Sequence, residues 1–134
     1  MMQEALTEKI IGYFYKVYNT LGFGFLEKVY ESALGHELRK AGLLVESQTN
    51  IKVFYDGITI GDYFADLSVE ETVIVEFKAS EALRPEHEAQ LVNYLRATKI
   101  EVGLLFNFGQ QPEMRRKIYE NRFKRGIIDS SPYL

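Results

Sequence analysis

The 134-residue sequence contains no cysteine and only two histidines, His36 and His87. The absence of cysteine excludes disulfide bonds, zinc sites built on thiolates and a thiol nucleophile. Two histidines are too few for a metal centre with several imidazole ligands. Any metal site in this chain would therefore use oxygen ligands, which suit Mg²⁺, Mn²⁺ or Ca²⁺.

Positive charge and long apolar runs are also scarce. The formal net charge is -3, so no overall basic field indicates nucleic acid. No apolar stretch is long enough to span a bilayer, and the N-terminus lacks the apolar core of a signal peptide. We therefore expect a cytoplasmic protein with no membrane partner. With 46% hydrophobic residues, a chain of this length is predicted to form a single domain over residues 1–134.

Four segments have apolar residues at the spacing of an amphipathic helix. The predicted helices cover residues 4–20, about 26–41, 84–98 and about 112–125. Gly42 is a natural stop for the second helix, and Pro85 suits the first turn of the third. In the fourth segment, the helical interpretation depends on the spacing of the following apolar residues: Met114, Ile118, Tyr119 and Phe123.

Four other segments are rich in β-branched and aromatic residues and predict strands. They are residues 44–55, 58–69, 73–79 and 101–108. The dipeptide Asp56-Gly57 predicts a hairpin between the first two strands. Glu70-Glu71 is expected to turn the chain into the third. The resulting order, α-α-β-β-β-α-β-α, predicts an α/β (α+β) fold with a mixed sheet flanked by helices.

The third predicted strand, VIVEFKA, is apolar except for Glu76 and Lys78. Burying such charges is costly unless they are paired or bind an ion. Side chains alternate along a strand, so Glu76 and Lys78 share one side of the sheet. In the preceding strand, alternation predicts an apolar face of Tyr63, Ala65, Leu67 and Val69 and an opposite face of Asp62, Phe64, Asp66 and Ser68. If the two strands pair, Asp66 can lie beside Glu76 and Lys78, where a divalent cation would relieve the repulsion between the carboxylates.

Two helical residues are further candidates for this site. Glu27 lies one turn before Tyr30, and Gln90 lies one turn before Tyr94. Each observation also has an ordinary explanation. An acid in a first helical turn is favoured by the helix dipole, a glutamine on a helix is commonly a surface residue, and Glu76 with Lys78 could be a solvated ion pair.

The order of these residues resembles the PD-(D/E)XK nuclease superfamily. Asp66 is followed after nine residues by Glu76-x-Lys78, and a helix bearing Glu27 precedes them. The resemblance implies that Asp66 and Glu76 bind Mg²⁺ or Mn²⁺, with Glu27 completing the acidic cluster. It also implies that Lys78 positions or activates the attacking water and that Gln90 orients Lys78 or a substrate phosphate.

More narrowly, GFLEKVYESAL is similar to the signature of the GxxExxY family, a compact branch of that superfamily. Gly24, Glu27 and Tyr30 occupy the signature, and the resemblance covers about residues 8–109. Phe64 departs from the family pattern, because family members often carry arginine there.

The resemblance implies a nuclease whose substrate is nucleic acid, DNA in preference to RNA. Tyr30 and Tyr94 are candidate substrate contacts, although both also suit the core. Arg115 and Arg116 lie in a basic stretch that is either a solvated helix face or a contact for a phosphate backbone. A chain of this size would contact little duplex alone, so a homodimer or a partner protein is a further expectation. The alternative function is a non-catalytic module that binds nucleic acid or protein. The intact acidic and lysine positions argue against this alternative, and Phe64 argues for it.

Overall fold

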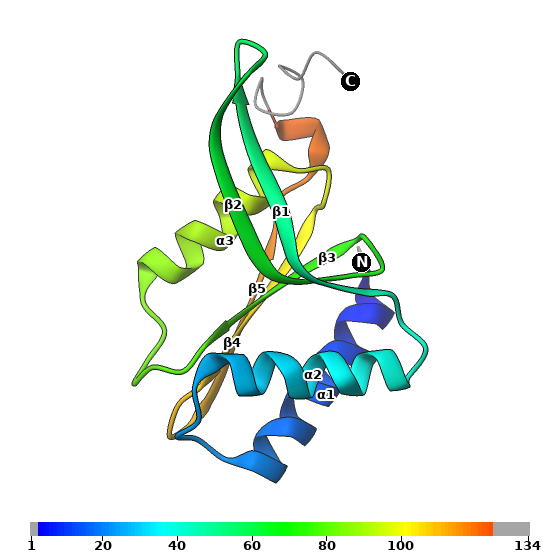
Figure 1. The fold of residues 1–134 in the computed structure, drawn as a ribbon, viewed down its shortest axis with the longest axis vertical. Coiled ribbons are helices and arrows are strands. Elements are labelled where there is room, and N and C mark those ends of the chain that lie inside the picture. The colour runs from blue at the N-terminus through cyan, green and yellow to red at the C-terminus, as the bar shows by residue number, and fades with distance from the viewer. Residues whose placement is uncertain (1–2, 125–134) are drawn as a thin grey trace.

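The computed structural model describes residues 3–124 and shows an α+β fold with one mixed sheet (Figure 1). The helices are α1 (Glu4–Leu21), α2 (Glu27–Lys40), α3 (Pro85–Ala97) and a short 3₁₀ helix, Asn121–Phe123. The strands are β1 (Val45–Tyr55), β2 (Ile58–Val69), β3 (Val73–Lys78), β4 (Val102–Phe108) and β5 (Pro112–Ile118). Among these residues no helix is long and apolar enough to cross a membrane.

The sheet has the order β1-β2-β3-β4-β5. Only β3 and β4 are parallel, and α3 forms the crossover between them. Helices α1 and α2 pack on one face of the sheet, over Val75 and Phe77 of β3. Helix α3 covers the other face, over Ile74. All seven residues of β4 are buried, as expected for a strand covered on both faces.

The two predicted turns between the first three strands are present. Asp56 and Gly57 have φ angles of 55° and 75°, and a two-residue type I′ hairpin requires positive φ at both positions. Glu70 and Glu71 also have positive φ. The Glu70 carboxylate accepts the backbone N–H of Leu44 at 2.7 Å, which ties this turn to the segment before β1.

The predicted last helix is wrong. Residues 112–118 form β5, which pairs antiparallel with β4, and residue 125 lies outside the described part of the chain. Met114 and Ile118 share a side in a strand as well as in a helix, because a spacing of four fits both periods. The tertiary structure selects the strand, since the free backbone groups of buried β4 need partners on that side.

The predicted apolar face of the second strand is also wrong. Tyr63 approaches Tyr94 of α3, and Ala65 packs in the same cluster as α3. Leu67, two residues further on, packs instead under α1 and α2. The strand therefore changes sides at Asp66, and simple alternation does not hold across this residue.

The change of side occurs where β2 leaves β3. The two strands pair only through residues 67–69 and 73–75. Before this point β2 pairs with β1 alone, and the two form a long hairpin that extends away from the rest of the sheet (Figure 1). Next to Asp66 in β1, Gln48 has a φ of 54°, a left-handed conformation that makes the ladder irregular here.

Candidate active site

Two carboxyl groups bridge the gap that opens between β2 and β3. The backbone N–H of Asp66 donates to Glu76 Oε2 at 2.6 Å. The backbone N–H of Phe77 donates to Asp66 Oδ2 at 2.8 Å. These bonds occupy the place of the next ladder bonds between the strands, and they hold both carboxyl groups in position. Among residues 3–124, the second oxygen of each carboxyl has no protein hydrogen-bond partner.

The pair lacks enough positive charge to compensate its burial. Glu76 is 6% exposed, and burial together with the charge of Asp66 raises its pKa to about 8. Burial also raises the pKa of Asp66, against the hydrogen bond from Phe77. Lys78, which is half-buried at the end of β3, lowers both pKa values through its charge but does not reverse either shift. A bound cation would stabilise both ionised forms.

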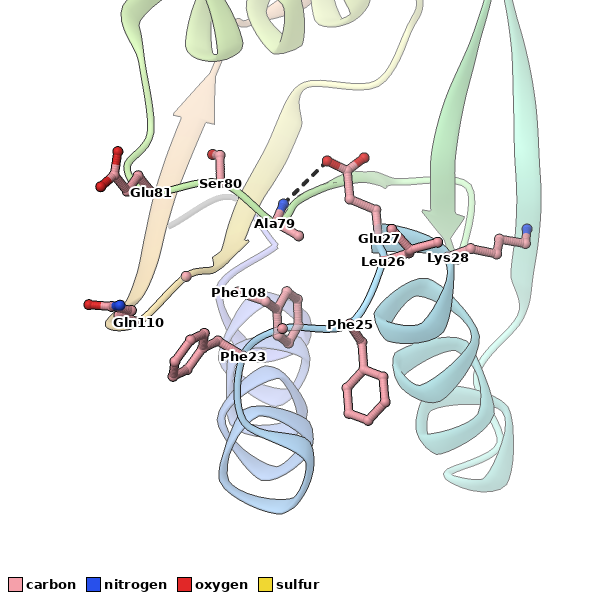
Figure 2. A pocket seen from close by; sticks show the side chains of 12 residues that line it. Phe23, Phe25, Leu26, Glu27, Lys28, Ala79, Ser80, Glu81, Phe108 and Gln110 are labelled. Atoms are coloured by element: carbon pink, nitrogen blue, oxygen red, sulfur yellow. Dashed lines mark hydrogen bonds between the residues drawn. The ribbon is translucent and has the colours of Figure 1, made fainter.

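Helix α2 brings two more acids to the pair. The Glu27 carboxylate accepts the backbone N–H of Ala79 at 3.2 Å (Figure 2), which joins the start of α2 to the residue after Lys78. Glu31 is 5% exposed, and its charge raises the pKa values of Asp66 and Glu76.

Glu31 is a site residue that the sequence analysis missed. Its carboxylate contacts Lys28 at 2.6 Å and accepts the Gln48 side-chain amide at 2.8 Å. With Asp66 and Glu27, these residues line a hollow of about 200 Å³. Because Glu31 follows Glu27 by four residues, helical spacing alone would have placed both acids on one side of α2.

Helix α3 places the predicted Gln90 and Tyr94 on the other side of the pair. Tyr94 is 6% exposed, and burial, with the charges of Glu76 and Asp66, raises its pKa to about 12. Its hydroxyl accepts the Gln90 side-chain amide at 2.9 Å. Gln90 therefore contacts Tyr94, whose pKa responds to the charges of the acidic pair.

Tyr30 does not face this site. It is fully buried, and its ring stacks on Phe108 at 4.0 Å. Its hydroxyl donates to the Gly22 carbonyl at 2.7 Å and accepts the Phe25 N–H at 3.2 Å. The structure therefore gives Tyr30 a role in holding the loop before α2.

The two arginines that were predicted to contact substrate do not lie near the acidic pair. Arg115 and Arg116 lie on β5, at the far edge of the sheet from the hairpin. Neighbouring residues of a strand point to opposite sides, so these two side chains do not form one patch. Arg115 forms ion pairs of 3.9 Å with Glu88 of α3 and with Glu113. Phe64, on the hairpin, is 55% exposed.

The donor set of the pair suits Mg²⁺ or Mn²⁺. Asp66 and Glu76 supply hard oxygen ligands without competing soft ones. Within residues 3–124, no three His, Asp or Glu side chains are grouped to hold an ion, so Glu27 is not placed as a third direct ligand. A two-carboxylate site still fits Mg²⁺, which commonly takes one or two carboxylates and completes its shell with water and substrate.

Comparisons with known proteins identify a family. A family model described as the PD-(D/E)XK nuclease superfamily matches residues 4–118. A solved structure titled "Crystal structure of SSO0001" is similar with a TM-score of 0.49 and 14% sequence identity. The match covers 69% of this chain and 50% of that one, so the chain spans about half the length of that protein. No curated protein matches the sequence.

Proposed function

The chain belongs to the PD-(D/E)XK nuclease superfamily, and from that premise we propose that it is a metal-dependent nuclease that hydrolyses phosphodiester bonds in DNA, in preference to RNA. The observation that supports this most is the pair of partly buried Asp66 and buried Glu76, which are cross-bonded at the gap between β2 and β3. Within the superfamily, the motif from Gly24 to Tyr30 supports the GxxExxY family.

Asp66 and Glu76 are the proposed ligands of Mg²⁺ or Mn²⁺. The ion, when bound, would lower the pKa of a water molecule and neutralise charge on the phosphate. The protein's own contribution is to withdraw two carboxyl groups from solvent, Glu76 fully and Asp66 in part, and to fix them with peptide N–H groups. This arrangement disfavours their ionised forms until a cation is present, and it ties metal binding to the loss of a proton from Glu76.

Lys78 is the proposed catalytic residue of the chain. Its ammonium group lies close enough to Asp66 and Glu76 to lower the pKa values of both. From there it can orient the attacking water and stabilise the negative charge that develops on the phosphate. Glu27 and Gln90 are proposed as positioning residues, Glu27 by holding the Ala79 N–H and Gln90 through Tyr94.

The test is cleavage of single-stranded, duplex and branched DNA with Mg²⁺ or Mn²⁺, by wild-type protein and by Lys78→Met. Methionine keeps much of the apolar stem of lysine and removes the charge. We expect cleavage by the variant to fall by about a hundredfold or more, the scale of losing one preorganised electrostatic group. Binding of Mn²⁺ and DNA should persist. Lys9→Met, at an exposed position on α1, is the matched control.

A non-catalytic binding module is the second candidate. Phe64 is 55% exposed and stands where the resemblance to the GxxExxY family implies an arginine, so the absence of that phosphate contact favours a binding module. Wild-type protein that binds DNA but cleaves none of the three substrates with either ion would select this function. A Lys78→Met variant as fast as wild type would refute the catalytic role of Lys78.

A further inference from the structure

A larger hollow, of about 680 Å³, lies beside the candidate active site. It is formed by the loop before α2, the segment after β3 and the turn between β4 and β5 (Figure 2). We call it the loop pocket, and its lining includes Phe23, Leu26, Glu27, Ala79, Ser80 and Gln110. Glu27 and Ala79 are also the residues that join α2 to the end of β3, so the loop pocket and the candidate active site share a wall.

The loop before α2 exposes large apolar side chains at this pocket. Phe23 is 56% exposed, Phe25 49% and Leu26 81%. Covering apolar surface is favourable, so a cluster of exposed apolar side chains of this kind indicates a surface that is covered in use. Both Phe23 and Phe25 line the pocket, and Figure 2 shows their rings pointing in different directions from the loop. The Phe25 ring forms a T-shaped contact with Tyr30, with 6.1 Å between the ring centroids.

The exposure is built into the fold and does not reflect a loose loop. Gly22 and Gly24 have φ angles of 67° and 112°, which favour glycine. Buried Tyr30 holds the loop through its hydroxyl, which bonds the Gly22 carbonyl and the Phe25 N–H. Phe23 is therefore presented to solvent from a fixed backbone.

We propose that the loop pocket binds an unpaired nucleobase of the substrate strand, stacked on Phe23, so that the protein acts on single-stranded or branched nucleic acid. The inference deepens the proposed nuclease function and rests on it. Aromatic side chains bind bases of any sequence through their π faces, and a base inside a duplex already stacks on its neighbours. Gln110 offers a side-chain amide at the same pocket for the base edge. The Ser80 hydroxyl donates to the Ala82 carbonyl at 3.2 Å and can offer the base only an acceptor.

The charges of the pocket favour a base over a phosphate. Glu27 and Glu81 contribute carboxylates to the lining. Among residues 3–124 the one cation of the lining, Lys28, is ion-paired with Glu31 at 2.6 Å. A phosphate group would be repelled here, whereas a neutral base would not. Because Glu27 lines both the loop pocket and the hollow that contains Asp66, a base in the loop pocket would place the adjoining phosphate beside that hollow.

The experiment measures binding without cleavage, by fluorescence anisotropy of labelled oligonucleotides in EDTA and, separately, with Ca²⁺. We expect Phe23→Ala to weaken binding of a single strand by about tenfold or more, the scale of one base–aromatic stack. Binding of a blunt duplex should not change. Phe23→Leu, which keeps an apolar side chain but removes the ring, should show most of the same loss. Tyr55→Ala, at a 69% exposed aromatic near the hairpin tip, is the control and should bind like wild type.

Several outcomes would overturn the inference. One is a Phe23→Ala variant that binds the single strand as tightly as wild type. Another is an equal loss for Tyr55→Ala, which would indicate unspecific contact. A third is a wild-type dimer that Phe23→Ala converts to a monomer, by light scattering, with unchanged DNA binding. That result would assign the pocket to a second copy of the chain.

The inference and the nuclease function can fail separately. If the protein binds single strands through Phe23 but cleaves nothing with Mg²⁺ or Mn²⁺, base binding by the loop pocket is supported and the nuclease function is refuted. If the protein cleaves duplex and single strands equally, whether or not Phe23 is present, the nuclease function is supported and base binding by the loop pocket is refuted.

Discussion

Replacing Glu76 with glutamine tests the burial of the Glu76 carboxyl without any assumption about substrate. Glutamine has nearly the same shape, and its side-chain carbonyl can still accept the Asp66 N–H that Glu76 Oε2 accepts at 2.6 Å. The substitution therefore removes the ionisable proton and keeps the contact. We expect Glu76→Gln to stabilise the metal-free protein at alkaline pH and to leave its stability unchanged in mild acid.

Glu76→Gln is expected to stabilise the protein at alkaline pH because the pKa of Glu76 is raised in the folded state. Between its ordinary value of 4.5 and about 8, the unfolded chain releases the Glu76 proton while the folded protein retains it. The folded state binds more protons in this window, so the free energy of unfolding falls as the pH rises through it. At about 1.4 kcal/mol for each unit of pKa, ionisation of Glu76 lowers the free energy of unfolding of wild type by at most about 5 kcal/mol. Relaxation of the protein around the charge reduces this loss. Above pH about 8 we expect the free energy of unfolding of Glu76→Gln to exceed that of wild type by about 2–4 kcal/mol.

The assay is urea unfolding in EDTA across this pH range, for wild type, Glu76→Gln and the control Glu8→Gln, an exposed acid on α1. Mn²⁺ should then stabilise wild type more at high pH, where protons compete less, and should not stabilise Glu76→Gln. A free-energy difference between wild type and Glu76→Gln that stays constant with pH would refute the burial argument.

Two further predictions concern the metal ligands and the loop. Asp66→Ala should abolish the rise in melting temperature that Mn²⁺ produces in wild type, because an ion stabilises only the state that binds it. Asp62→Ala, on the exposed part of the same strand, should keep that rise, and equal Mn²⁺ binding by both variants in calorimetry would contradict the site. Tyr30→Phe should cost about 1–2 kcal/mol in urea unfolding, because it removes a buried hydroxyl that serves two backbone groups. Tyr15→Phe, at a half-exposed position on α1, should cost nothing measurable, and equal losses would show that the Tyr30 hydroxyl does not hold the loop.

Local patterns predicted most of the elements because each depends on a short stretch of chain. The apolar spacing of α1, α2 and α3 and the dipeptide Asp56-Gly57 act over a few residues, and the structure confirms them. The last strand could not be predicted in this way. Its apolar spacing of four fits a helix and a strand alike, and the choice depends on β4, whose backbone needs a partner at that edge.

The candidate site, like the fold, was predicted from the sequence only in part. The order of Glu27, Asp66, Glu76 and Lys78 was sufficient to indicate the superfamily, which the match over residues 4–118 confirms. Helical spacing also carried a signal for Glu31 that the sequence analysis did not use. Alternation along β2, by contrast, gave the wrong faces, because the strand changes sides at Asp66 where it leaves β3.

Sequence alone determined which residue types are present and in what order: the acids and lysine of the motif, the turn residues, and a chain without thiols. Only the tertiary structure decided what surrounds them. The separation of β2 from β3 turns two carboxyl groups into a bridge between strands, and the hydroxyl of buried Tyr30 holds the loop that exposes Phe23. These arrangements depend on contacts between residues far apart in the chain, and such contacts set burial and charge, which no local pattern records.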